Sequence, residues 1–183
     1  MAVKSLPPQD VLNQLLRYEP ETGLTFWRPR TVEWFPAVTQ NRSRSLCALW
    51  NKRYAWQQAF PTISDGYYIG TIDGTFYKLH RVIWKIMTGI DPDQIDHIDG
   101  NRQNNKFTNL RDVTLAENAK NRAIPSNNKS GCIGVYFWDH DGLQYWVALV
   151  GENYKYFKTK EEAITVRKAA ELERGFHVNH GRS

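Results

Sequence analysis

The sequence predicts an α+β fold in which short antiparallel sheets alternate with short helices. Three observations lead to this prediction. Two strand-like stretches flank Asp73-Gly74, a dipeptide that favours a hairpin turn because its residues tolerate positive φ angles. A strand pattern, an extended segment and a helix start follow one another between residues 93 and 122. Near the C-terminus, three aromatic-rich strand patterns precede one helix pattern.

The N-terminal region is expected to begin with a short helix. Asp10 is placed to cap it, Pro20 and Gly23 would end it, and apolar residues recur at helical spacing at Val11, Leu12, Leu15 and Leu16. The alternating LTFWRPR that follows predicts a strand. Residues 28–60 mix aromatic and cationic side chains without a clear period, so an irregular region with one or two strands is expected.

The middle of the chain carries the clearest local signals. After the hairpin of YYIGTI and TFYKLH, the stretch RVIWKIMTG has helical spacing, and Gly89 is placed to stop the helix. The acidic stretch DQIDHIDGNRQNN follows, with a turn at Asp99-Gly100, and FTNLRDVT returns as a second short strand or an extended loop. Thr114 and Glu117 have the spacing of a capping box, which predicts a helix start.

The C-terminal part is expected to be a three-stranded sheet covered by one helix. Its strands are IGVYFW, LQYWVALV and YKYF, and the helix runs from about Lys160 to Arg174, with Gly175 to end it. One helix face is expected to contain Ala163, Val166, Ala169, Ala170 and Leu172. With a polar linker near residues 124–130, three domains are predicted, at 1–64, 65–123 and 130–183.

Composition limits the possible roles. The 183 residues carry a net charge of +5, which favours a polyanionic partner but is also compatible with many other proteins. Two cysteines without a Cys-x-x-Cys pair argue against structural zinc and against a disulfide framework. No apolar run approaches the roughly 20 residues of a membrane span, and the N-terminus lacks the apolar centre of a signal peptide. We therefore expect a cytoplasmic protein without a membrane partner.

The acidic stretch combines residues that suit phosphodiester hydrolysis. Such a reaction needs a base for water, a hard cation for the leaving oxygen and groups that hold the phosphate. His97 fits the base, because an unperturbed histidine pKa near 6.5 leaves it neutral at pH 7. Asp96 faces the opposite side of the strand, and its carboxylate with an asparagine carbonyl would suit Mg²⁺ or Mn²⁺.

A simpler interpretation stays open at this point. An Asp-His-x-Asp-Gly sequence alone is more often a surface turn than a catalytic site, and runs of asparagine usually cap turns, so Asn104 and Asn105 are taken as loop residues without a role. His80, before a buried helix, is interpreted as a packed histidine and not as a second base. The ordered downstream residues Asn109 and Asn118 favour the catalytic interpretation.

The stretches LHRVIWKIMTG and IDHIDGNRQNNKFTNLRDVTLAENAKNR resemble the HNH endonucleases, in particular the phage branch that includes homing enzymes. LLRYEPETGLTFWR also resembles the opening of such phage proteins, so the likeness covers residues 10–122. The resemblance implies a ββα-metal unit in which His97 is the general base and Asn109 is the central asparagine that orients it. Asp96 and Asn118 would hold one Mg²⁺ or Mn²⁺, and an asparagine at the third position favours Mg²⁺ over Zn²⁺. Phosphate contacts are expected from Arg81 and Arg102.

Residues 126–176 resemble the ethylene-response-factor type of DNA-binding domain, through matches that include Gly134-Val135, Trp146-Val147-Ala148 and Glu162-Ala163. Arginines of the plant domains are replaced here by Ile133, Tyr136 and Trp138, which removes the expected base readout. The DNA-facing side is expected to contain Tyr136, Trp138, Gln144, Trp146 and Lys155, unless Trp138 and Trp146 simply pack together. A second possible contact with the DNA backbone, unless these cations are merely solvated, is formed by Arg42, Arg44, Lys52 and Arg53.

The sequence therefore predicts a metal-dependent endonuclease of nicking or homing type in a phage-infected bacterial cell. It would act on double-stranded DNA as a monomer or a dimer, and one active site would cut one strand per docking event. The alternative is a DNA-binding regulator or a structural phage protein whose nuclease site has decayed.

Overall fold

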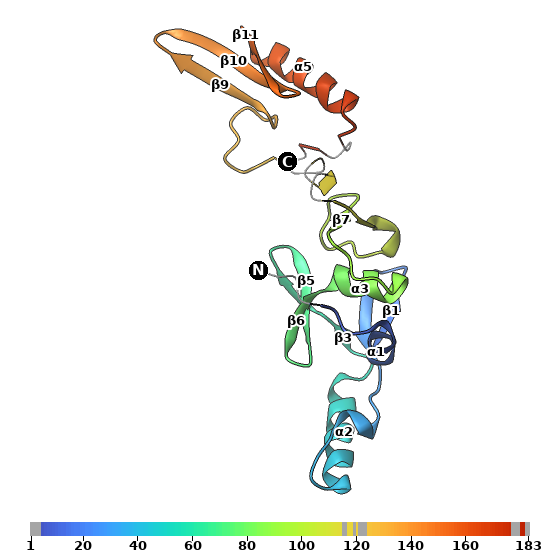
Figure 1. Ribbon diagram of the computed structural model, residues 1–183. Coiled ribbons are helices and arrows are strands. Elements are labelled where there is room, and N and C mark those ends of the chain that lie inside the picture. Colours follow the sequence, from blue (N-terminus) through green and yellow to red (C-terminus); the bar gives the residue numbers. More distant parts are fainter. Residues whose placement is uncertain (1–4, 115–116, 119, 121–123, 177–179, 182–183) are drawn as a thin grey trace. The chain divides into compact units, whose positions relative to one another are not determined.

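The computed structural model describes residues 5–114, 117–118, 120, 124–176 and 180–181. The chain divides into two compact units, residues 1–112 and 113–183 (Figure 1). The sheets of the described part are small and antiparallel, in the strand orders β1-β2-β3, β4-β5-β6, β7-β8 and β11-β10-β9. Helices and antiparallel sheets thus alternate as the α+β prediction requires. The predicted division into three domains, at 1–64, 65–123 and 130–183, stays a prediction.

The first helix is shorter than expected and has a different start. α1 (Gln9–Leu15) begins after Pro8 without a side-chain cap, so the predicted Asp10 cap is wrong; Asp10 lies in the first turn, where the helix dipole favours a negative charge. The chain becomes extended at Leu16 because β1 (Leu16–Glu19) pairs with β2 (Leu24–Trp27). The short β3 (Gln58–Ala59) joins the other edge of β2.

The region expected to be irregular contains a long helix. A 3-10 turn, η1 (Val32–Trp34), precedes α2 (Gln40–Tyr54), and the Thr39 hydroxyl caps α2 by accepting from the Arg42 amide at 3.3 Å. None of the α2 residues is buried, which explains why no apolar period was visible. Asn51 fastens α2 to the preceding segment through two 2.8 Å hydrogen bonds with the backbone of Arg30.

The predicted hairpin and the helix after it are confirmed. β4 (Thr62–Ser64), β5 (Tyr67–Ile72) and β6 (Thr75–Lys78) form one sheet, and Asp73 and Gly74 turn between β5 and β6 with φ angles of 46° and 74°. α3 (Leu79–Thr88) follows directly and ends at Gly89 with φ 75°. α1, β1, β6 and α3 surround one core with the fully buried side chains Leu12, Leu15, Leu16, Phe60, Leu79, Val82 and Ile83.

The acidic stretch begins on a short strand, as predicted, and FTNLRDVT contains a second short strand, one of the two conformations considered for it. β7 (Ile95–His97) pairs antiparallel with β8 (Leu110–Asp112), and a 3-10 turn, η2 (Phe107–Asn109), leads into β8. The Gly100 amide donates to the His97 carbonyl at 2.8 Å, and Gly100 has φ 75°, which confirms the turn at Asp99-Gly100. The loop of residues 98–106 and η2 connect β7 to its antiparallel partner β8.

The second unit has the predicted sheet and helix. β9 (Val135–His140), β10 (Leu143–Val150) and β11 (Asn153–Phe157) form a sheet with β10 in the centre, and α5 (Lys160–Glu173) packs along it (Figure 1). Thr159 caps α5 in a capping box with Glu162. The first turn is made at Asp141-Gly142, where both φ angles are positive.

The buried face of α5 differs from the prediction at its end. Ala163 and Ala170 are buried as expected, but Ala169 is exposed and Leu172 is 81% exposed, so the assignment of these two residues to the buried face is wrong. The place of Leu172 is taken by a buried ion pair, in which Arg167 Nε lies 2.9 Å from Glu171 Oε1. Arg167 also donates to the carbonyl oxygens of Leu149 and Ile133, at 2.6 and 3.1 Å, and so fastens α5 to the sheet.

Candidate active site

β7 and β8 bring together the first part of the candidate site. Asp96 and His97 are adjacent on β7 and are 7% and 4% exposed. Successive residues of a strand point to opposite sides, so the two side chains face different surroundings, as the sequence predicted. Across the pair, Asp96 lies opposite Arg111 and His97 lies opposite Leu110.

Arg111 engages the carboxylate that the sequence assigned to a metal ion. Its Nε and Nη2 both donate to Asp96 Oδ2, at 3.0 and 2.7 Å. The charge of the buried carboxylate is thereby compensated by a guanidinium that is 35% exposed. Sequence reasoning did not single out Arg111; only the register of the β7–β8 pair reveals it.

Asn105 contacts the candidate base directly. Its Oδ1 lies 3.1 Å from His97 Nε2, and Asn105 is only 1% exposed. Asn105 thus lies in the loop, as the sequence indicated, but it is buried against His97 and not solvated. Nothing in the run of asparagines distinguishes Asn105 from Asn104, which is bonded through its Nδ2 to Asp99 Oδ2 at 2.7 Å.

Asn109 holds the loop and not the ring of His97. Its Nδ2 donates to Asp99 Oδ1 at 2.9 Å and to the Asn104 carbonyl at 2.8 Å, while its Oδ1 accepts from the Asp99 amide at 3.1 Å. Its own carbonyl accepts from the Ile98 amide at 2.9 Å. These bonds close the loop after β7, so any influence of Asn109 on His97 acts through the backbone.

The candidate base is one of three rings that form a compact cluster. The centroids of His80 and His97 are 5.1 Å apart, and Tyr67 lies 5.0 and 6.0 Å from them. Burial, with a smaller contribution from nearby positive groups, lowers the pKa of His80 to about 2, so this ring is a neutral packed histidine at pH 7. Burial also lowers the pKa of His97, although the bond to Asn105 and the Asp99 charge oppose the effect. His97 is therefore neutral at pH 7 and able to accept a proton.

The two arginines expected to contact phosphate have different surroundings. Arg102 lies 4.9 Å from the Tyr67 ring centroid and donates to the Asp65 carbonyl at 3.0 Å, so it stands at the edge of the ring cluster. Lys78 covers Tyr67 as well, at 4.1 Å. Arg81 instead donates to the backbone carbonyls of Pro92 and Asp93, at 2.7 and 3.2 Å, and supports the segment that leads into β7.

Asn118 belongs to the second unit, and its pairing with Asp96 stays a prediction. Its amide donates to the Thr114 carbonyl at 2.9 Å, and Thr114 and Glu117 form the expected reciprocal cap. In the described part of the chain, no three His, Cys, Asp or Glu residues gather as a metal-ion site. The predicted donors are one carboxylate and one carboxamide oxygen, a set that suits Mg²⁺, which keeps several water ligands.

The sheet of the second unit separates the residues expected to face DNA. Trp146 lies opposite Phe137 and Phe157, and Lys155 lies opposite the buried Ala148, so the expected placement of Gln144, Trp146 and Lys155 beside Tyr136 is wrong. These three residues occupy the α5 side of the sheet. The other side carries an aromatic face made of Tyr136, Trp138, Tyr145, Tyr154 and Tyr156.

Ring contacts show the same separation. Trp138 lies 6.2 Å from Tyr145, whereas Trp146 lies 5.3 Å from Phe137, so the packing of Trp138 on Trp146 considered from the sequence does not occur. On the aromatic face, Tyr136, Tyr154 and Tyr156 are 45%, 56% and 58% exposed. Lys158 covers Tyr145 at 4.4 Å and adds a positive charge there.

The basic residues predicted for DNA contact lie on α2. Arg42, Arg44, Lys52 and Arg53 are all exposed. Arg42 and Arg53 share one side of the helix, because eleven residues make about three turns.

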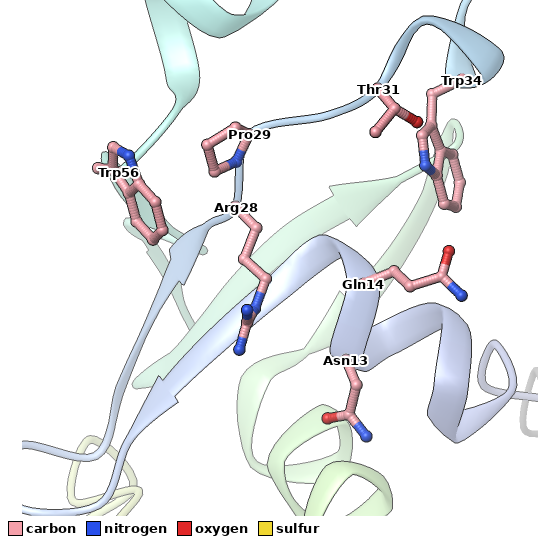
Figure 2. Close-up of a pocket in the computed structure, with 7 residues that line it drawn as sticks. All are labelled: Asn13, Gln14, Arg28, Pro29, Thr31, Trp34 and Trp56. Atoms are coloured by element: carbon pink, nitrogen blue, oxygen red, sulfur yellow. The ribbon is translucent and has the colours of Figure 1, made fainter.

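Figure 2 shows an open groove in the same unit, with Arg28 between the rings of Trp34 and Trp56. The other lining residues are Asn13, Gln14, Pro29 and Thr31, so the groove is separate from the His97 cluster.

Comparisons with known proteins agree with the central part of this geometry. Residues 77–120 match a family model described as HNH endonuclease. Protein 3.8 of Escherichia phage T7 is 40% identical over 65 residues, which cover 33% of this chain and 54% of that protein. The chain thus spans about half the length of this curated relative. No solved structure matches, and no helix among the described residues is long and apolar enough to cross a membrane.

Proposed function

We propose that the chain is a metal-dependent endonuclease that hydrolyses phosphodiester bonds in double-stranded DNA. The observation that carries the proposal is the buried, neutral His97, hydrogen-bonded to Asn105 within the segment that matches the HNH endonuclease family. A neutral imidazole held by its neighbours is what a general base for water requires.

His97 takes the proton from the attacking water in this proposal, and Asn109 keeps the loop after β7 closed around it. Asp96 and Asn118 would hold one Mg²⁺ or Mn²⁺. When bound, the cation supplies positive charge that stabilises the departing 3′ oxygen. Arg111 would have to share the Asp96 carboxylate with that cation, because two of its N–H groups already bond to Oδ2.

DNA binding would use surfaces in both units. Arg102 is placed beside the ring cluster and would contact phosphate near His97. Arg81 supports backbone carbonyls and is a weaker candidate. The exposed cations of α2 offer backbone contacts, and the aromatic face of the second unit offers stacking and shape contacts in the manner of a DNA-binding domain of the ethylene-response-factor type. With one site for each chain, a monomer would nick, and double-strand cutting would need a second docking event or a dimer.

A phage protein acting in the cytoplasm of an infected bacterium fits the similarity to Protein 3.8 of Escherichia phage T7. We propose in addition that the endonuclease is of the nicking or homing type.

A plasmid assay tests the proposal. Supercoiled DNA is incubated with the full chain in Mg²⁺ or in EDTA, and with the Asp96→Asn variant in Mg²⁺. The proposed nuclease activity is supported if the wild type nicks the plasmid in Mg²⁺ and neither the EDTA reaction nor the Asp96→Asn variant does. A wild type that shifts DNA in a gel but does not nick it in Mg²⁺ or Mn²⁺ would make the chain a DNA-binding protein with a decayed site.

A further inference from the structure

We propose that Asn105 is a positioning residue that fixes the tautomer and orientation of His97, and that the hairpin of β1 and β2 holds Asn105 in place through Tyr18. The inference rests on the proposed role of His97 as the general base. It assigns a role to two features that the proposed mechanism leaves unused, the second asparagine of the Asn104-Asn105 pair and the N-terminal stretch RYEPETG.

The hydrogen bonds of Asn105 determine which atom faces the imidazole. Its Nδ2 donates to the Gln103 carbonyl at 3.3 Å, which directs Oδ1 toward His97 Nε2 at 3.1 Å. A carboxamide oxygen can only accept, so His97 Nε2 must carry the proton. The lone pair of the neutral ring then lies on Nδ1.

Tyr18 fastens the backbone on both sides of Asn105. Its hydroxyl donates to the Asn105 carbonyl at 3.2 Å and accepts from the Phe107 amide at 2.8 Å. Burial raises the pKa of Tyr18, so the hydroxyl stays protonated and can donate. Tyr18 is part of β1, which is paired along its length with β2, so the hydroxyl is presented from a rigid element.

The turn of the same hairpin approaches the loop closely. Gly23, with φ 75°, sits so near that a Cβ atom would lie 2.7 Å from the Asn105 carbonyl carbon and from the Lys106 amide nitrogen. Any side chain at residue 23 would therefore displace the backbone that carries Asn105. Two contacts from one hairpin thus fix the backbone position of Asn105, and the Asn105 side chain determines the orientation of His97.

Loss of this support should lower turnover without removing the base. A partner that orients a functional histidine is worth on the order of 10- to 100-fold when it is removed. We expect Asn105→Ala to lower the nicking rate by about that factor and Tyr18→Phe to lower it by less, because the loop keeps its other bonds. Tyr77→Phe is the matched control, since the Tyr77 hydroxyl bonds to the Ser5 carbonyl, outside the loop.

The deciding experiment reads the tautomer directly. The full chain is labelled with ¹⁵N-histidine, and long-range ¹H–¹⁵N spectra are recorded without DNA or metal at about pH 8, where the ring is neutral. The wild type should show His97 protonated at Nε2, Asn105→Ala should show a mixture of tautomers, and Asn105→Asp, which keeps an acceptor oxygen, should restore the Nε2–H form. Tyr18→Phe should shift the His97 signals more than Tyr77→Phe does.

The outcomes separate this inference from the proposed function. A wild-type ring protonated at Nδ1, or an unchanged tautomer in a folded Asn105→Ala variant, overturns it. If Asn105→Ala fails to fold, the wild-type spectrum and the comparison of Tyr18→Phe with Tyr77→Phe decide. The predicted spectra in a wild type that never nicks DNA would instead leave the positioning role intact and refute the nuclease.

Discussion

Replacement of Arg111 by methionine removes the guanidinium from a buried carboxylate. The Asp96 side chain is 8% exposed, and it would keep its negative charge after the arginine is removed. Removing one partner of a fully buried ion pair costs about 3–5 kcal/mol, whereas an exposed pair contributes about 1 kcal/mol or less. Because the guanidinium is 35% exposed, we expect an intermediate loss in the free energy of unfolding, about 2 kcal/mol.

The loss can be measured by urea unfolding in EDTA. Five of the seven tryptophans precede residue 112, so their fluorescence reports mainly on the first unit. With a slope of about 2 kcal/mol per molar urea, Arg111→Met should lower the midpoint by roughly 1 M. When millimolar Mg²⁺ replaces EDTA, the loss should be smaller, because a cation on Asp96 would compensate the negative charge of its carboxylate.

Lys85→Met is the control for this measurement. Lys85 pairs with Asp91 at 2.9 Å, but Asp91 is 40% exposed, so water solvates the carboxylate that remains. The loss for Lys85→Met should stay below about 1 kcal/mol. An equal loss for the two variants would refute the argument that burial of Asp96 makes the Arg111 pair valuable.

Three further predictions concern the second unit and the base. Arg167→Met should cost about 3–5 kcal/mol and speed hydrogen exchange across the sheet, whereas Lys168→Met, whose side chain is 47% exposed, should cost less than about 1 kcal/mol; equal effects would contradict the buried ion pair. Since burial lowers the pKa of His97, the nicking rate should be at its maximum above pH 6.5 and should fall only as the pH drops through the lowered pKa. A midpoint of the acid-side loss of rate at or above pH 6.5 would contradict this. Trp138→Ala should weaken DNA binding in gel shifts about tenfold, the loss of one stacking contact, and unchanged affinity would remove the aromatic face from the DNA interface.

Features set by neighbouring residues could be predicted from the sequence. The Asp73-Gly74 and Asp99-Gly100 turns, the stop at Gly89 and the Thr114–Glu117 cap depend on local φ angles or on spacings of three residues. These local sequence patterns predict turns, stops and caps correctly because contacts with distant residues favour the same local structure.

Features set by distant contacts could not be predicted. α2 has no buried face and therefore no apolar period, and the chain leaves the helix at Leu16 because β2 offers a pairing partner. Trp146 was placed on the wrong side of the sheet because an error of one residue in alternation exchanges the two faces.

The candidate site shows the same limit. Both Asn105 and Asn109 follow His97 in an asparagine-rich loop, and composition alone gives no reason to choose between them. Only the folded loop shows that Asn109 bonds to Asp99 while Asn105 reaches the imidazole. Arg111 is revealed in the same way, by its position opposite Asp96.

The central claim is that His97 is the base of a DNA-cutting enzyme. Its most direct test is a comparison of single-turnover nicking by the wild type and by His97→Ala, in Mg²⁺ and at saturating protein. If His97 is the base, the variant's rate constant is lower by a factor on the order of 10² to 10⁴, and its DNA affinity in gel shifts is unchanged. Equal rate constants for the two proteins would contradict this claim.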